Sequence, residues 1–179
     1  MGERIRIAFD TELQRRRLGV LLRIPIAIPP ALALAGWTVL VVAALPLAWM
    51  LTAARVELPD PLHRFEARYL LDVTRFAAWL ALVSAHERVS LEAPRLLQPR
   101  ATVVFRPLLA LPAIVLGSVL AVALAWAAVA AWFVALARGR TTEGLRELGA
   151  FCIRYQAETL AYLMLLTPCY PAVAPQTPQ

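Results

Sequence analysis

The sequence predicts an all-α integral membrane protein with four helices, built from two tandem two-helix repeats with short β segments at the membrane surface. Three observations predict this fold: two long uncharged runs, an internal similarity between the halves, and a charged helix after each run. The chain has 179 residues and is 60% hydrophobic, whereas roughly 45–50% is usual for soluble proteins.

The two uncharged runs extend from Ile24 to Ala54 and from Pro107 to Ala137, 31 residues each. A helix of this length measures about 46 Å at ~1.5 Å per residue, and a bilayer core needs only about 20 residues. The first run begins too late and is too long for a signal peptide, whose apolar region has about 7–15 residues. We therefore expect both runs to be retained as membrane-spanning helices.

Prolines lie early in both runs, at Pro29, Pro30 and Pro112. Proline starts or kinks a helix because it lacks an N–H group and clashes with the preceding turn. The sequence therefore predicts an interfacial segment up to each proline and spanning helices over residues 30–53 and 112–136.

The two halves of the chain resemble each other at an offset of 83 residues. The matched positions are Arg23 and Arg106, Pro29 and Pro112, Trp49 and Trp132, Arg55 and Arg138, and Leu62 and Leu145. Matches of Arg, Pro and Trp carry weight in a chain so rich in Ala and Leu. They divide it into unit one (1–86), unit two (87–172) and a Pro-rich tail (173–179).

Each unit opens with alternating apolar residues, Ile5, Ile7 and Phe9 in the first and Val89 and Leu91 in the second. Alternation of this kind is typical of a strand. We expect the two segments to pair with each other at the membrane surface.

A second helix is predicted after each run, over 62–84 and 145–167. Asp60-Pro61 resembles an N-cap followed by a first-turn proline. Thr141-Thr142-Glu143 supplies a cap and a negative charge near the other helix start.

Charges inside these second helices predict buried pairing. Arg75 and Glu158 each lie nine residues before the expected helix end, about 14 Å along the axis. Charges at this depth normally face the bundle interior and pair. Two passes per unit make both units point the same way, so equivalent positions share one depth. This predicts the pairs Arg64–Glu147 and Arg75–Glu158.

Two alternatives remain open for these charges. Within each helix, Arg68–Asp72 and Arg154–Glu158 are neighbours at four-residue spacing and compete as partners. If Arg75 and Glu158 sit at the interface instead, the second helices are half-inserted or lie on the membrane surface. A proton or ion relay is the functional interpretation, and a neutralised structural pair is favoured over it.

All 18 basic residues are Arg, and the formal net charge is +6. These residues flank apolar helices and do not form one basic stripe, which argues against nucleic-acid binding. Contact with anionic lipid headgroups suits them better, with these candidates: Arg23, Arg55, Arg106 and Arg138. No glycine-rich phosphate loop, metal-ligand spacing or catalytic constellation is present, so no cofactor, metal or enzymatic activity is expected.

Unit two carries a more specific pattern. It contains Phe105-Arg106, Leu111-Pro112, Ala131-Trp132-Phe133, Gly139-Arg140, Arg154-Tyr155, Ala161-Tyr162, Leu165-Leu166-Thr167 and Tyr170-Pro171. In order and spacing this resembles the bacterial family known as domain of unknown function 4389, whose members often carry two copies. Thr141-Thr142 departs from the aromatic residue and proline common in the family. The resemblance implies a multi-pass bacterial membrane protein and no established activity.

The expected function is a non-enzymatic membrane scaffold or accessory subunit, acting as a homo-oligomer or with a membrane partner. A small transporter or lipid-handling protein is the alternative, and it requires a cavity that reaches Arg75, Glu158 or Arg154. The resemblance implies the bacterial cytoplasmic membrane, and the Arg distribution predicts that both termini lie in the cytoplasm.

Overall fold

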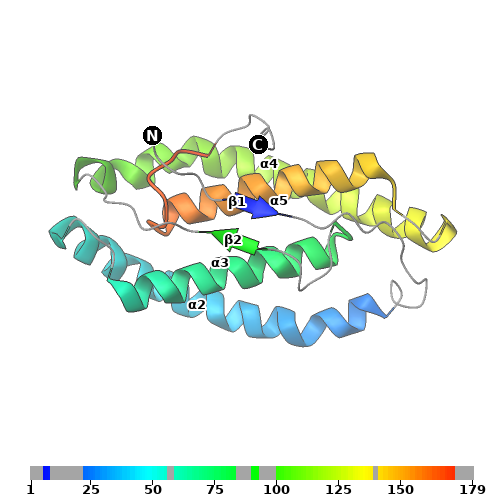
Figure 1. Ribbon diagram of the computed structural model, residues 1–179, viewed down its shortest axis with the longest axis horizontal. Helices are drawn as coiled ribbons and strands as arrows, with labels where there is room; N and C mark the ends of the chain where they lie inside the picture. The colour runs from blue at the N-terminus through cyan, green and yellow to red at the C-terminus, as the bar shows by residue number, and fades with distance from the viewer. Residues whose placement is uncertain are drawn as a thin grey trace.

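The computed structural model describes residues 6–8, 22–55, 59–83, 90–92, 100–138 and 141–171. The helices are α2 (Arg23–Arg55), α3 (Asp60–Leu80), α4 (Arg100–Arg138) and α5 (Glu143–Leu163), as Figure 1 shows. The strands are β1 (Arg6–Ala8) and β2 (Ser90–Glu92). The predicted four-helix character is confirmed, and α2 and α4 are long and apolar enough to cross a membrane.

The two strands form one antiparallel pair, in which Ile7 lies opposite Leu91. Arg6 faces Glu92 and Ala8 faces Ser90 on either side of this central pair. The pair connects two segments that lie 84 residues apart in the sequence, and each strand has only three residues.

The long helices begin earlier than predicted. α2 starts at Arg23 and continues through Pro29, Pro30 and Pro46. α4 starts at Arg100, twelve residues before Pro112. Prolines interrupt single hydrogen bonds without ending a helix where neighbouring groups compensate, as in membrane helices. The uncharged runs therefore lie within continuous helices of 33 and 39 residues.

The shorter helices end earlier than predicted, at Leu80 and Leu163. Two residues later, Leu82 and Leu165 each adopt a φ of 60°, a left-handed conformation that usually takes glycine. The following N–H groups bond back into the helices: Val83 to the Ala78 carbonyl at 2.9 Å, and Leu166 to the Ala161 carbonyl at 3.0 Å. Leucine in these turns gives no stop signal that sequence rules recognise.

At the helix starts, the predicted side-chain caps do not form. Pro59 occupies the N-cap of α3, so Asp60 is the first helical residue, and Thr142 occupies the N-cap of α5. Neither start has a side-chain capping hydrogen bond. Asp60 and Glu143 place a negative charge in each first turn, where the helix dipole favours it.

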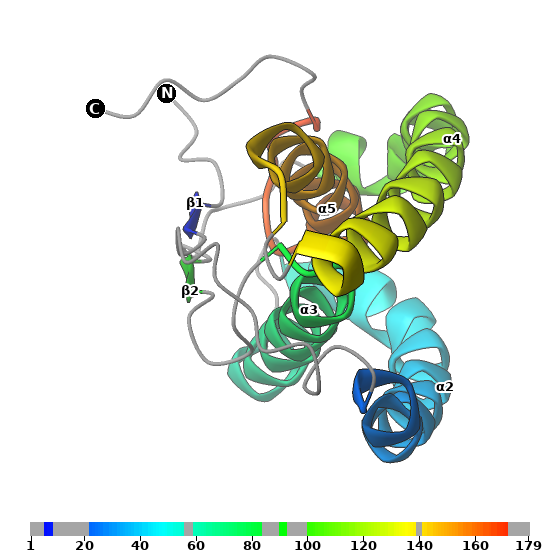
Figure 2. The same cartoon turned by 90° about the vertical axis from the view of Figure 1, so that its right-hand side faces the viewer.

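The elements form three layers, seen end-on in Figure 2. The strand pair lies on one side, α3 and α5 form the middle layer, and α2 and α4 form the opposite side. The main core lies between the helices and includes Val41, Tyr69, Ala78, Ile153 and Ala161. At the α2–α3 seam, Trp37 packs on Phe65 and on Tyr69, with ring centroids 5.8 and 6.0 Å apart.

The two halves run in opposite directions, which corrects the prediction that they point the same way. A Cβ atom built on Gly149, near the start of α5, would lie 2.6 Å from Cγ2 of Val83, just after the end of α3. α3 and α5 are therefore antiparallel neighbours (Figure 1). The prediction assumed that the chain re-enters the bundle at the end where α3 leaves it, but α4 begins at the opposite end.

Candidate functional site

An exposed apolar stripe follows each long helix. Its members, which are between 59% and 72% exposed, are Leu32, Val39 and Met50 on α2, and Leu108, Val115, Val122, Trp126 and Phe133 on α4. Within each helix they are spaced by 4, 7 or 11 residues, which places them on one helical face. Each of these two helices thus presents a continuous hydrocarbon surface to its surroundings.

These helices are not the core of a soluble domain. The candidate spans are Pro25–Thr52 and Leu108–Arg138. In the apolar 18-residue stretch of each span, only 11% of the residues are buried inside the molecule. Monomeric soluble proteins rarely expose contiguous apolar patches of more than a few hundred Å². An exposed apolar surface of this extent marks an interaction with a membrane or with other apolar protein surfaces.

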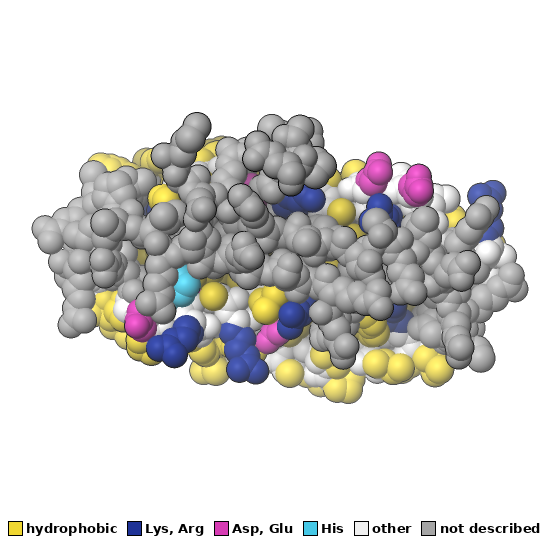
Figure 3. Space-filling view, viewed as in Figure 1, with side chains coloured by type: hydrophobic (Ala, Val, Ile, Leu, Met, Phe, Trp, Pro, Cys, Tyr) yellow, Lys and Arg dark blue, Asp and Glu magenta, His cyan; other side chains and the backbone are white. Residues whose placement is uncertain are grey.

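The strand side of the molecule has a different character. Figure 3 views this side and shows Arg, Asp and Glu side chains on it, interspersed with apolar ones. Exposed charged residues of α3 and α5 include Arg64, Arg68, Glu143 and Glu147. The molecule therefore has one charged side and one apolar side.

Arg23 and Arg106, two of the predicted headgroup ligands, are buried at helix ends. Nη1 of Arg23 donates to the Trp79 carbonyl at 2.6 Å, and Nη1 of Arg106 donates to the Tyr162 carbonyl at 2.9 Å. Each guanidinium also lies over the ring of the same residue, at 4.7 Å for Trp79 and 4.4 Å for Tyr162. The C-terminal end of a helix attracts cations, so each arginine caps the second helix of its own half.

The other two predicted headgroup ligands differ from these. Arg138 is exposed in the last turn of α4, and the side chain of Arg55 lies outside the described residues. Headgroup contact at any of these arginines stays a prediction.

Two tryptophans connect the halves. Nε1 of Trp49, near the end of α2, donates to the Leu163 carbonyl at 3.1 Å, where α5 ends. Nε1 of Trp132, near the end of α4, donates to the Leu80 carbonyl at 3.1 Å, where α3 ends. The two donors, Trp49 and Trp132, are 83 residues apart, and so are the two acceptors, Leu80 and Leu163. The two bonds are therefore equivalent contacts, one made from each half to the other.

The antiparallel packing separates one predicted charge pair and brings the other to one level. Arg64 lies 16 residues before Leu80, about 24 Å along the axis, whereas Glu147 lies beside that end of α3. Arg64 and Glu147 are too far apart to form the predicted pair. Arg75 and Glu158 lie eight and nine residues from the Val83–Gly149 contact, about 12 and 14 Å along the same direction.

The second pair therefore shares one level in the middle layer. Arg75 is half-buried and Glu158 is 6% exposed. Their mutual ion pair stays a prediction, as do the competing partners Arg154 and Asp72, which are half-buried.

Glu66 is a buried group that sequence reasoning did not single out. Its side chain is fully buried in α3, and neither carboxyl oxygen has a hydrogen-bond partner among the described residues. The sequence feature that could have predicted its burial is its position four residues before Leu70 and three before Tyr69, on the face that α3 buries. The 83-residue offset places Gly149 at the equivalent position.

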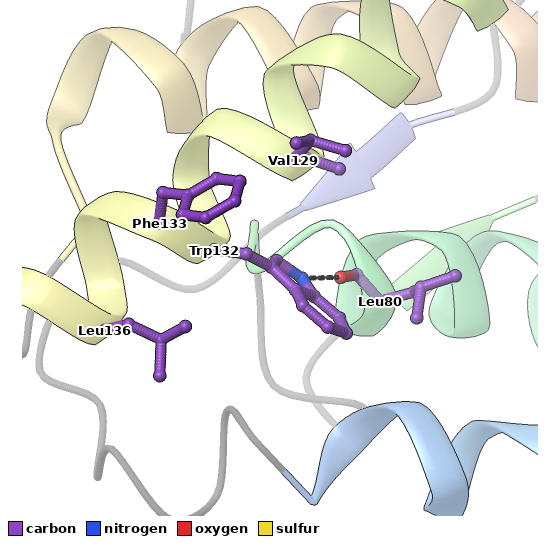
Figure 4. Close-up of a pocket in the computed structure, with 6 residues that line it drawn as sticks. Leu80, Val129, Trp132, Phe133 and Leu136 are labelled. Carbon is purple, nitrogen blue, oxygen red and sulfur yellow. Dashed lines mark hydrogen bonds between the residues drawn. The ribbon is translucent and has the colours of Figure 1, made fainter.

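A cavity of about 360 Å³ opens beside Trp132 on the apolar side (Figure 4). Its lining residues are Leu80, Ala128, Val129, Trp132, Phe133 and Leu136. The Trp132 N–H is already bonded to the Leu80 carbonyl, so the cavity offers hydrocarbon and ring surfaces. None of the residues lining it is Arg75, Glu158 or Arg154, which a transport pathway was expected to reach.

The fold and its apolar surface define a helical protein with two helices of membrane-spanning character. A family model described as domain of unknown function (DUF4389) matches residues 100–174, which include α4 and α5. The predicted family resemblance is thereby confirmed over these residues. No curated protein and no solved structure matches the chain.

Proposed function

We propose that this protein is a membrane-embedded, non-enzymatic scaffold or accessory subunit. The observation that carries the proposal is the exposed apolar surface of α2 and α4, of which little is covered by the rest of the chain. Burying apolar surface contributes about 25 cal/mol per Å², so transfer of two such helices into lipid is strongly favourable.

The recurrence of the same helix-end contacts in the two halves supports a structural role. The arginine caps, the tryptophan bonds and the left-handed leucines all recur at the 83-residue offset. The arginine and tryptophan contacts hold α2 and α4 near both of their ends against the C-terminal ends of α3 and α5. A rigid frame of this kind suits a protein that holds partners or further copies of itself in the membrane.

The membrane in this proposal is the bacterial cytoplasmic membrane, with the charged side and both termini in the cytoplasm. The partners are lipids, with anionic headgroups near the exposed Arg138, and further copies of the chain.

Cross-linking in intact membranes tests the assembly: a ladder of multiples supports the oligomeric scaffold, and a band of single chains alone rejects it.

Alkaline carbonate extraction of membranes tests the embedding. We expect the wild-type protein to stay in the membrane pellet. Val115→Arg combined with Trp126→Arg, on the exposed stripe of α4, should release a large fraction, because a charge in hydrocarbon costs about 2.5–3.5 kcal/mol. Glu147→Arg, on the charged side, is the matched control and should stay in the pellet. Release of the wild-type protein would reject the proposal.

A lipid-handling protein is the second candidate, and the cavity beside Trp132 favours it. An apolar cavity of about 150 Å³ can bind benzene, and 360 Å³ falls within the usual range of ligand pockets, roughly 300–1,000 Å³. Ala128→Phe should fill the cavity and reduce the lipid that copurifies, measured by native mass spectrometry. Val122→Phe, on the same helix outside the cavity lining, is the control. Equal lipid in both variants would reject this role for the cavity.

A further inference from the structure

The connection between the halves constrains how the helices sit in a membrane. It leaves α3 at Val83, beside Gly149 at the start of α5. It enters α4 at Arg100, and Arg106 in the first turns of α4 bonds the Tyr162 carbonyl at the other end of α5. The connection therefore joins opposite ends of α5, which are about 20 Å apart along its axis.

The strand pair lies along this connection. β2 belongs to it, pairs with β1, and lies beside the middle layer on the side away from α2 and α4 (Figure 2). If the helices crossed a bilayer, this two-stranded pair would lie at the depth of the hydrocarbon with unpaired edges. Open sheet edges exposed to lipid do not occur there, because each unsatisfied backbone group costs several kcal/mol.

The length of the apolar surface also argues against helices that cross the bilayer. On α4 the exposed stripe extends from Leu108 to Phe133, 25 residues apart, or about 38 Å. The hydrocarbon core of a bilayer is only about 30 Å thick. A surface that lies parallel to the membrane has no such limit on its length.

We infer that the four helices lie in the plane of the membrane, with α2 and α4 embedded among the acyl chains of one leaflet. The inference rests on the proposed membrane embedding and adds its direction. The apolar side faces the bilayer interior, and the charged side with the strand pair faces water. A helix layer about 10–12 Å thick fits within one leaflet, and amphipathic surfaces bind membranes in this orientation.

Sidedness of the connections tests the inference. Single cysteines replace Asp60, at the start of α3, and Glu143, at the start of the antiparallel α5, in a chain that carries Cys152→Ala and Cys169→Ser. A membrane-impermeant thiol reagent is applied to sealed vesicles of each orientation. In-plane helices place both positions on one side, so both react in the same preparation. Reaction of the two positions in opposite preparations overturns the inference and establishes crossing helices.

Depth along the exposed stripe gives a second measurement. Nitroxide labels are placed one at a time at Leu108, Val115, Val122 and Phe133, and collisions with oxygen and with a water-soluble relaxant report depth. In-plane helices give nearly equal depths at all four positions. Depths that change steadily across the bilayer overturn the inference. Contact with the water-soluble relaxant at all four positions, together with carbonate release, rejects the membrane proposal itself.

Discussion

The first hairpin, α2–α3, and the second hairpin, α4–α5, share their end contacts and differ in what lies between them. Each has an arginine cap, a tryptophan that bonds the other half, and a left-handed leucine after its second helix. Inside, the first hairpin buries the Glu66 carboxyl where the second has Gly149. The contacts at helix ends thus define the frame, while the interior positions between them tolerate different chemistry.

The arginine caps provide the strongest test of this comparison. Arg106→Ala should lower the free energy of unfolding by about 3 kcal/mol, because it removes a buried hydrogen bond and leaves a cavity. Arg23→Ala should cost less, since Arg23 is 7% exposed and Arg106 is fully buried. Unfolding by denaturant in detergent micelles measures both. Arg106→Met keeps most of the side-chain volume and should lose less stability than Arg106→Ala. The difference between the two variants separates the effect of the cavity from that of the lost hydrogen bond.

The close contact at Gly149 distinguishes the second hairpin. Gly149→Ala should cost about 2 kcal/mol, because its Cβ atom would lie 2.6 Å from Val83 Cγ2 and overpacking costs roughly 1–3 kcal/mol. Gly144→Ala in the same helix is the control, since nothing lies within 4 Å of a Cβ there. That variant should gain up to about 1 kcal/mol of helix propensity. Similar losses in both variants would contradict tight packing between α3 and α5.

The sequence predicts which residues make the contacts at the helix ends better than it predicts how the helices pack between those ends. The 83-residue offset of Arg23 and Arg106 and of Trp49 and Trp132 identified residues that make equivalent contacts. Their direction was not readable, because identical spacing fits parallel and antiparallel halves equally well. The assumption of parallel halves therefore produced the pair Arg64–Glu147.

The helix boundaries show a similar limit. Proline rules placed the start of α2 at residue 30, but a long apolar helix accommodates Pro29 and Pro30 and begins at Arg23. Glycine rules could not place the ends of α3 and α5, because leucines adopt the left-handed turns. Both errors arise where tertiary packing outweighs a local preference.

The buried carboxyl distinguishes the first hairpin. Glu66→Leu should raise the free energy of unfolding by about 1–2 kcal/mol, because it removes a buried polar group that has no partner among the described residues. Glu147→Leu, at an exposed position of α5, is the control and should change stability by less than about 0.5 kcal/mol. A loss of stability in Glu66→Leu would show that the carboxyl makes a stabilising interaction.

The two tryptophan bonds should contribute equally if the halves are equivalent at their ends. Trp132→Phe and Trp49→Phe each remove one donor to a helix-end carbonyl, and each should cost about 1 kcal/mol. The two bonds lie at opposite ends of the molecule, so the double variant should show the sum of the single effects within ~0.5 kcal/mol. A double variant that loses clearly more than this sum would mean that each bond compensates for loss of the other. In that case the two hairpins are held together as one cooperative unit, and the contacts at the helix ends act jointly.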